Sequence, residues 1–167
     1  DNCSTDATES ILCNNSRSFP RTVLIEKDNG PASAINKGLG LASAKYIAWL
    51  NADDFYINDK VLYSIMEVFE HYANIDVVTC DGYYTDEEGK FLRPIIMSDF
   101  DLDPNVLKYR SKILQPATFW RSSLNVKLSE SLSYTFDWDL WLRLMHAGCG
   151  FYYLRKYVAC FRIQPNS

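Results

Sequence analysis

Histidine is scarce in this sequence, with two residues, and the five cysteines include no C-x-x-C pair. An odd cysteine count without paired spacing argues against a disulfide framework and against a structural zinc site, and it suits a reducing compartment. Because nitrogen and sulfur ligands are so few, we expect any bound metal to be a hard cation held by carboxylates.

Long apolar runs and clusters of basic residues are also missing. No apolar stretch approaches the roughly 18 residues of a membrane span. The formal net charge is −4, which disfavours a nucleic-acid surface. In contrast, apolar residues make up 47% of the 167 residues, so the chain has enough material for the core of one folded domain.

Strand and helix patterns alternate along the chain. This alternation predicts an α/β fold with a largely parallel sheet, and a hairpin turn at residues 86–90 makes the second half of the sheet mixed. The predicted extended segments are 22–27, 45–50, 76–84, 91–96, 114–120 and 150–161, and the predicted helices are 31–43, 59–71 and 136–147.

Two adjacent acids, Asp53 and Asp54, follow the apolar strand 45–50. Ligands of α/β proteins bind beyond the carboxyl ends of the strands, where this pair should lie. Neighbouring carboxylates repel each other, and Phe55 and Tyr56 would limit their solvation. A divalent cation between them would explain the pair, whereas the alternative is a plain solvated turn.

A second acidic stretch begins the helix at 136–147. Asp137 lies in its first turn, where a carboxylate interacts favourably with the helix dipole, so it is either a capping acid or a general base. Asp139 and Arg143 have the spacing of a structural ion pair. Trp138 and Trp141 are either core residues or a platform for a sugar ring.

Several other polar residues have both an ordinary and a functional interpretation. Asp28 lies in a turn or in a nucleotide-contacting loop, and Lys37 is a surface lysine or a phosphate contact. Gly38 is unfavourable by about 1 kcal/mol inside a helix, which indicates close packing. Gln115 and Arg121 are either ordinary strand residues or part of a site.

The order of these motifs resembles a known family. D-x-x-S-T-D-x-T at 1–8, A-x-N-x-G at 34–38, L-N-A-D-D at 50–54, QPATFWR at 115–121 and D-W-D-L-W-L-R at 137–143 closely resemble the family 2 inverting glycosyltransferases of the GT-A fold. The resemblance extends from residue 1 to about residue 162. It implies a Rossmann-like, three-layer α/β/α domain with a mixed, mainly parallel sheet. Residues 1–167 would be a single catalytic domain without the family's first strand-helix-strand unit.

The resemblance also implies roles for individual residues. Asp1 and Asp28 match positions that contact the nucleotide base, and Asp53 matches an acid near the ribose and diphosphate. Asp54 matches the direct ligand of Mn²⁺ or Mg²⁺, and Asp137 matches the catalytic base. Asn51 stands where a strict D-x-D motif would begin. The remaining candidates for nucleotide-sugar binding are Lys37, Gln115 and Arg121.

The implied activity is metal-dependent transfer from a nucleotide-diphosphate sugar, preferably a UDP-sugar, to a hydroxyl group of a saccharide or lipid-linked saccharide. A carboxylate would take the proton of the acceptor, and the cation would neutralise the diphosphate leaving group. The alternatives are a non-catalytic nucleotide- or carbohydrate-binding remnant and a nucleotidyltransferase. We expect a cytoplasmic location, with peripheral association at the inner face of the membrane left open.

Overall fold

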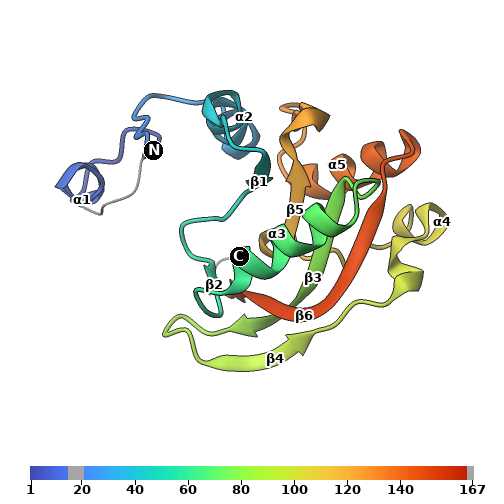
Figure 1. The fold of residues 1–167 in the computed structure, drawn as a ribbon. Helices are drawn as coiled ribbons and strands as arrows, with labels where there is room; N and C mark the ends of the chain where they lie inside the picture. The colour runs from blue at the N-terminus through green and yellow to red at the C-terminus, as the bar shows by residue number, and fades with distance from the viewer. Residues whose placement is uncertain (15–20, 165–167) are drawn as a thin grey trace.

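A computed structural model describes residues 1–14 and 21–164 of the chain (Figure 1). Its centre is a six-stranded sheet with the order β1-β5-β3-β6-β2, and β4 pairs with β3 outside this path. The strands are β1 (Tyr46–Ala48), β2 (Phe55–Tyr56), β3 (Val77–Thr85), β4 (Phe91–Ile95), β5 (Thr118–Arg121) and β6 (Phe151–Arg162).

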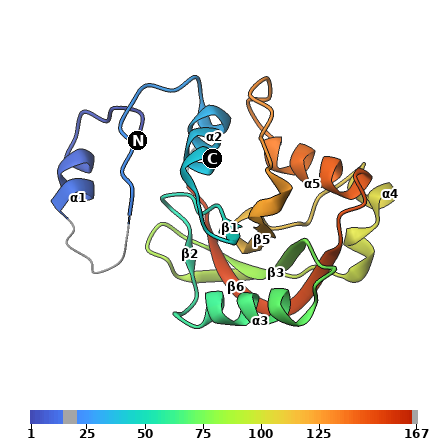
Figure 2. The same cartoon turned by 45° about the horizontal axis from the view of Figure 1, so that its top comes forward.

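Helices cover both faces of the sheet, which gives three layers. Figure 2 shows α3 on one side of the sheet and α2 and α5 on the other. The α-helices are α1 (Thr8–Asn14), α2 (Pro31–Leu41), α3 (Val61–His71), α4 (Pro104–Leu107) and α5 (Phe136–His146), and the short 3-10 helices are η1 (Asp99–Leu102), η2 (Gln115–Ala117) and η3 (Ser122–Leu124).

The apolar periodicity of the sequence explains these layers. In α3, Val61, Ile65, Val68 and Phe69 are buried, and this spacing places them on one face of the helix. Strand side chains alternate between the two faces. Neighbouring residues of one strand therefore belong to different cores: Val77 packs in the α2 and α5 core and Val78 in the α3 core. The expected α/β/α arrangement is confirmed.

The direction of the strands differs from the expectation of a mainly parallel sheet. Within residues 1–14 and 21–164, β3 and β6 form the one parallel pair, while β1–β5, β5–β3, β3–β4 and β2–β6 are antiparallel. Strands β1 and β3 do run in the same direction, as a crossover through α3 requires. They are not neighbours, however, because β5 lies between them. The sheet is mixed, as expected, but mostly antiparallel.

The N-terminal region is less regular than predicted. The expected strand at 22–27 is an extended segment outside the sheet, in which the Glu26 N–H donates to the Asp1 carbonyl oxygen at 3.1 Å. Helix α1 buries none of its side chains, and Figures 1 and 2 both show it set apart from the sheet.

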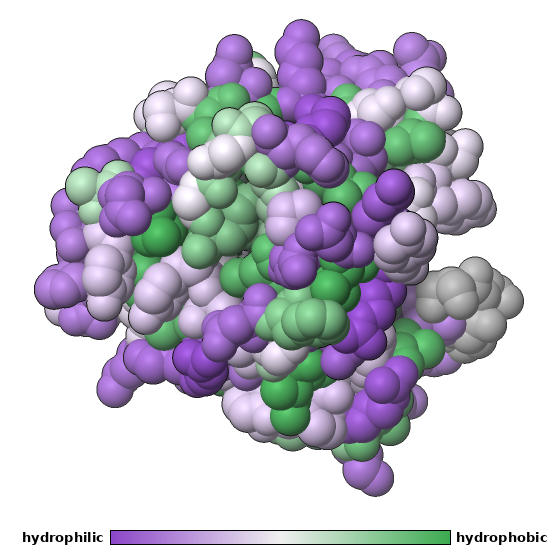
Figure 3. Space-filling view, turned by 90° about the vertical axis from the view of Figure 1, so that its right-hand side faces the viewer, coloured by the Kyte–Doolittle hydropathy of each residue, from purple (hydrophilic) through white to green (hydrophobic). Residues whose placement is uncertain are grey.

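The outer surface mixes polar and apolar groups. Figure 3, which views the molecule from the right-hand side of Figure 1, shows hydrophilic residues around most of the rim and hydrophobic residues towards the middle. In the part of the chain that the structure describes, no helix has both the length and the apolar character needed to cross a membrane.

Candidate active site

The turn after β1 holds the two adjacent acids in very different surroundings. Asp54 is 7% exposed. Its Oδ1 accepts a hydrogen bond from the Arg162 backbone N–H at 3.1 Å, and its Oδ2 accepts one from Asn51 Nδ2 at 3.1 Å. Burial raises the pKa of the Asp54 carboxyl and the neighbouring Asp53 charge adds to this shift, while the two hydrogen bonds oppose it.

Asp53 is the more available of the two acids. It is half-buried, and its carboxylate makes no hydrogen bond or ion pair with any described residue. The resemblance had implied that Asp54 is the direct cation ligand. In the structure Asp54 is the anchored carboxylate and Asp53 is the open one, and the direct cation ligand stays a prediction.

The carboxylates of this edge supply only part of a cation's coordination shell. Among residues 1–14 and 21–164, no three or more His, Cys, Asp or Glu residues are grouped as a metal site. Mg²⁺ is commonly bound by one or two carboxylates, with water and substrate phosphates completing the shell. The pair Asp53 and Asp54 fits that kind of site, in which the substrate contributes ligands.

Asn51 and Trp49 connect this turn to Gln115 in η2. Trp49 Nε1 donates to Asn51 Oδ1 at 2.7 Å, and Asn51 Nδ2 donates to Gln115 Oε1 at 3.2 Å. Gln115 Nε2 donates back to the Trp49 carbonyl oxygen. Gln115 therefore lies beside the turn that holds the two acids. Trp49 was not predicted from the sequence, because its partner Gln115 lies 66 residues away along the chain.

Asp137 lies at the N-terminus of α5, on the same side of the molecule as Trp49. The preceding residue, Phe136, stacks on the Trp49 indole with ring centroids 5.5 Å apart. Burial raises the pKa of Asp137, and hydrogen bonds from the backbone N–H groups of Trp138 and of Asp137 itself partly oppose this. A carboxylate with a raised pKa is a better proton acceptor for a reaction near neutral pH.

A separate pocket brings together three residues that the sequence assigned to nucleotide-sugar binding. Asp1, Asp28 and Lys37 line a pocket of about 190 Å³ between the N-terminal segment and α2. Asp28 Oδ1 accepts a hydrogen bond from the Gly30 N–H at 2.8 Å. Lys37 Nζ forms an ion pair with Glu26 Oε1 at 2.7 Å. Three carboxylates line the pocket, those of Asp1, Glu26 and Asp28, and Glu26 is the one paired with the lysine.

Gly38 also lines this pocket, and its packing differs from the expectation. A Cβ atom added at Gly38 would have nothing within 4 Å, so the position is open rather than closely packed. Gly38 therefore lines the pocket without a close helix contact that would require a glycine.

Arg121 does not belong to this site, which corrects the assignment from the sequence. Because β5 is antiparallel to β1, Arg121 lies opposite Tyr46 at the start of β1, away from Gln115 at the other end of the segment. Its guanidinium donates to the carbonyl oxygens of Phe69 and Ile75, both at 2.7 Å, and of Tyr72 at 3.1 Å. Arg121 caps the C-terminal end of α3.

Of the two tryptophans of α5, Trp141 belongs to the core and Trp138 packs half-buried against it. Trp141 is fully buried and meets Trp120 edge-on, with ring centroids 6.0 Å apart. Trp138 Nε1 donates to the Leu107 carbonyl oxygen at 2.6 Å. The expected structural ion pair of Asp139 and Arg143 is present at 2.9 Å.

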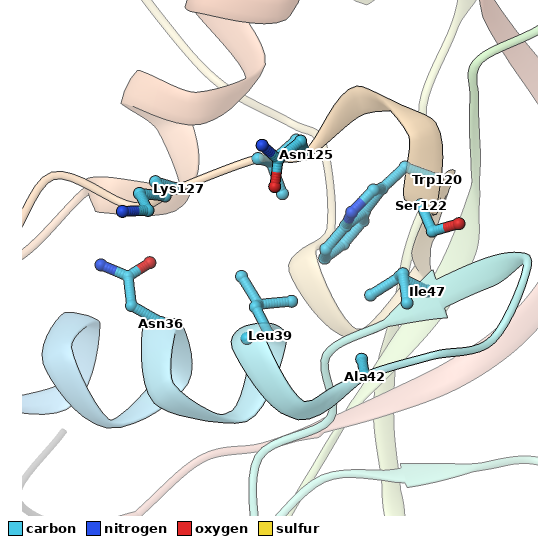
Figure 4. Close-up of a pocket in the computed structure, with 10 residues that line it drawn as sticks. Asn36, Leu39, Ala42, Ile47, Trp120, Ser122, Asn125 and Lys127 are labelled. Carbon is cyan, nitrogen blue, oxygen red and sulfur yellow. The ribbon is translucent and has the colours of Figure 1, made fainter.

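Another pocket, of about 220 Å³, lies beside β1 without any of the predicted site residues. Figure 4 shows it between Asn36 and Leu39 of α2, Ile47 of β1, and the segment from Trp120 to Lys127. Asn36 is held to the Leu128 backbone by two hydrogen bonds of 2.8 and 3.0 Å. This pocket holds none of the acids that would serve the expected chemistry.

Comparison with known proteins agrees with the motifs. The model of the family "Glycosyl transferase family 2" matches residues 1–158. An uncharacterized glycosyltransferase of Methanocaldococcus jannaschii is 27% identical over 99% of this chain and 59% of its own length. The succinoglycan biosynthesis protein ExoO of Rhizobium meliloti is 32% identical over 49% of this chain and 25% of its own length.

Solved structures show the same fold. The crystal structure of S. aureus TarS 1–349 in complex with UDP-GlcNAc aligns with a TM-score of 0.74 and 17% identity, over 100% of this chain and 49% of that chain. The chain thus spans 59% of the length of the Methanocaldococcus jannaschii protein and 49% of this TarS chain.

Proposed function

As a member of glycosyl transferase family 2 this chain is a glycosyltransferase, and we propose that it transfers a sugar from a UDP-sugar to a hydroxyl group of a saccharide or lipid-linked saccharide. We further propose that residues 1–167 act as one catalytic domain. The observation that carries the proposal is the contact of Trp49 with Phe136, which joins the strand-end acids to the helix whose first turn holds Asp137.

Asp137 is the proposed catalytic base. The acceptor hydroxyl must lose its proton as its oxygen attacks the anomeric carbon, and a carboxylate is suited to accept that proton. Direct attack with one base inverts the anomeric centre, and it requires no nucleophile from the enzyme. The raised pKa and half-buried position of Asp137 support this role.

Asp53 and Asp54 are the residues that would hold Mn²⁺ or Mg²⁺. Such a cation would neutralise the charge that develops on the diphosphate leaving group. The open Asp53 carboxylate fits direct contact with the ion, while the buried Asp54 is held by Asn51 and Arg162. A nearby positive charge would also relieve the repulsion between the two acids.

The pocket lined by Asp1, Asp28 and Lys37 is the proposed site of the nucleotide. Carboxylate oxygens accept hydrogen bonds from the N–H group of a uracil ring, and the lysine adds positive charge close to where phosphates would lie. That the similar TarS was crystallised with UDP and with UDP-GlcNAc favours a uridine nucleotide. Gln115, at the opposite side of the strand end, is proposed to border the sugar.

The chemical class of the acceptor is proposed from the chemistry of the transfer reaction and from the name of one relative. A relative named for succinoglycan biosynthesis favours a saccharide acceptor over a protein or nucleic acid. Lipid-linked acceptors lie at a membrane surface, so the proposal includes peripheral contact with the inner face of the membrane. The expected cytoplasmic location is part of the same proposal.

Product analysis tests the function against its alternatives. The protein is incubated with a panel of UDP-, dTDP- and GDP-sugars and Mn²⁺, and released nucleoside diphosphate is measured. The proposal expects release of UDP from a UDP-sugar and its loss in Asp137→Asn. Pyrophosphate formed from UTP and a sugar 1-phosphate would contradict it in favour of a nucleotidyltransferase. Binding of UDP without any turnover would favour the non-catalytic remnant.

A further inference from the structure

Three side chains at the end of β1 form a closed ring of hydrogen bonds. Trp49 donates to Asn51, Asn51 donates to Gln115, and Gln115 donates back to the Trp49 backbone. Each amide in the ring donates once and accepts once within it. This arrangement fixes which way the Asn51 and Gln115 amides point, because turning either amide would break two bonds at once.

The ring contacts Asp54 through Asn51. The second N–H of Asn51 Nδ2 donates to Asp54 Oδ2 at 3.1 Å, and the Asn51 carbonyl oxygen accepts from the Asp54 N–H at 3.3 Å. On its other side the ring contains the Trp49 indole, which stacks on Phe136 next to Asp137. Asn51 therefore links the cation side of the site to the base side.

We propose that Asn51 is a positioning residue whose amide holds Asp54 and, through Trp49 and Phe136, the α5 terminus that carries Asp137. The inference rests on the proposed function. It differs from the view that Asn51 is a weak substitute for a third carboxylate at this edge. In our account the amide is required, because its nitrogen must donate to two acceptors.

The hydrogen-bond pattern explains why a carboxylate could not take this role. Asn51 Nδ2 lies between two acceptor oxygens, Asp54 Oδ2 at 3.1 Å and Gln115 Oε1 at 3.2 Å. An ionised aspartate has no hydrogen to donate, so its oxygen would face both of them with lone pairs. It would also bring a third negative charge next to Asp53 and Asp54, which the charge of Arg162 in β6 would offset only in part.

Asn51→Asp separates the two views, because it changes one atom and adds one carboxylate. If Asn51 substitutes for a ligand, the variant binds Mn²⁺ and UDP more tightly than the wild type. If Asn51 is a positioning residue, the variant loses at least about tenfold in UDP affinity with Mn²⁺ present, since two donor contacts are lost and two buried acceptors are left unpaired. The measurement is titration calorimetry with UDP at fixed Mn²⁺ concentration.

Asn58→Asp is the matched control. Asn58 is exposed and uses only its oxygen, which accepts the Lys60 N–H at 2.9 Å, so an aspartate keeps the contact while adding the same charge on the other side of β2. We expect wild-type affinity from this variant. A loss as large as that of Asn51→Asp would mean that added charge alone weakens binding, and it would overturn the positioning role.

Trp49→Phe gives a second test if Asn51→Asp does not fold. Phenylalanine keeps a ring to stack on Phe136 but removes the N–H that orients the Asn51 amide. We expect the turnover number for the donor to decrease several-fold while KM changes less, because the substrate still binds but Asp137 is less well placed. Unchanged turnover, or a loss confined to thermal stability, would refute the inference. If the wild type binds no UDP at all, the proposed function fails rather than this refinement.

Discussion

Replacing Arg121 distinguishes a structural residue from a substrate contact. The guanidinium donates to three carbonyl oxygens at the end of α3, two of them at 2.7 Å in half-buried surroundings. It also lies 5.1 Å from the Phe69 ring centroid and 5.7 Å from that of Tyr46. Arg121→Ala removes all of these contacts and leaves the helix end without its cation.

The expected loss of stability is about 3 kcal/mol. Hydrogen bonds from a charged donor contribute about 1.5–3 kcal/mol each when buried, so we count the two half-buried bonds at the low end and neglect the exposed third. For a chain of this size, each kcal/mol shifts the melting temperature by roughly 2–4 °C. We therefore expect a decrease of about 6–12 °C in thermal unfolding.

Binding of UDP with Mn²⁺ should be nearly unchanged in the folded Arg121→Ala protein. Arg121→Lys is the control, because lysine keeps the charge but has one donor nitrogen in place of the separate Nε and Nη donors of the planar guanidinium, and it should recover only part of the stability. Calorimetric unfolding and UDP titration are performed on the same samples. A melting temperature within about 2 °C of the wild type, together with a tenfold loss of UDP affinity, would show that Arg121 borders the substrate after all.

Three further predictions follow from the same geometry. Asp137→Asn should lower the transfer rate by about 10²–10⁴-fold while the UDP affinity stays close to that of the wild type; a loss of stability with normal transfer would support a capping role instead. Burial raises the pKa of Asp137, and a base must be unprotonated to act. The transfer rate should therefore decrease on acidification at a pH above the ordinary aspartate pKa, whereas a decrease that begins only below the ordinary aspartate range would contradict this. Gly38→Ala and Gly40→Ala should each stabilise α2 by about 0.5–1 kcal/mol, but only Gly38 lines the proposed nucleotide pocket, so a loss of UDP affinity is expected for Gly38→Ala alone.

The parts of the fold that local sequence patterns determine were predictable. The spacing of Val61, Ile65 and Phe69 predicts α3, and the hairpin turn at 86–90 predicts the pairing of β3 with β4. The position of β5 between β1 and β3 was not predictable in this way. Strand neighbours that are about 70 residues apart depend on packing against both layers of helices, which local periodicity does not report.

The site shows the same limit. Asp53, Asp54 and Asp137 could be selected from residue type and from their places at a strand end and a helix start. The difference between the anchored Asp54 and the open Asp53 depends on the Arg162 N–H, which lies 108 residues further along the chain. The residues next to Arg121 in the sequence do not indicate that its hydrogen-bond partners are the carbonyl oxygens at the end of α3.

Titration calorimetry of the wild type with UDP, with and without Mn²⁺, tests the central claim most directly. We expect the wild type to bind one UDP per chain, and only when the cation is present. In Asp53→Asn we expect most of the UDP affinity to be lost and the remaining binding to be independent of the cation. UDP binding that is equally tight without the cation and in Asp53→Asn would contradict the assignment of the strand-end acids.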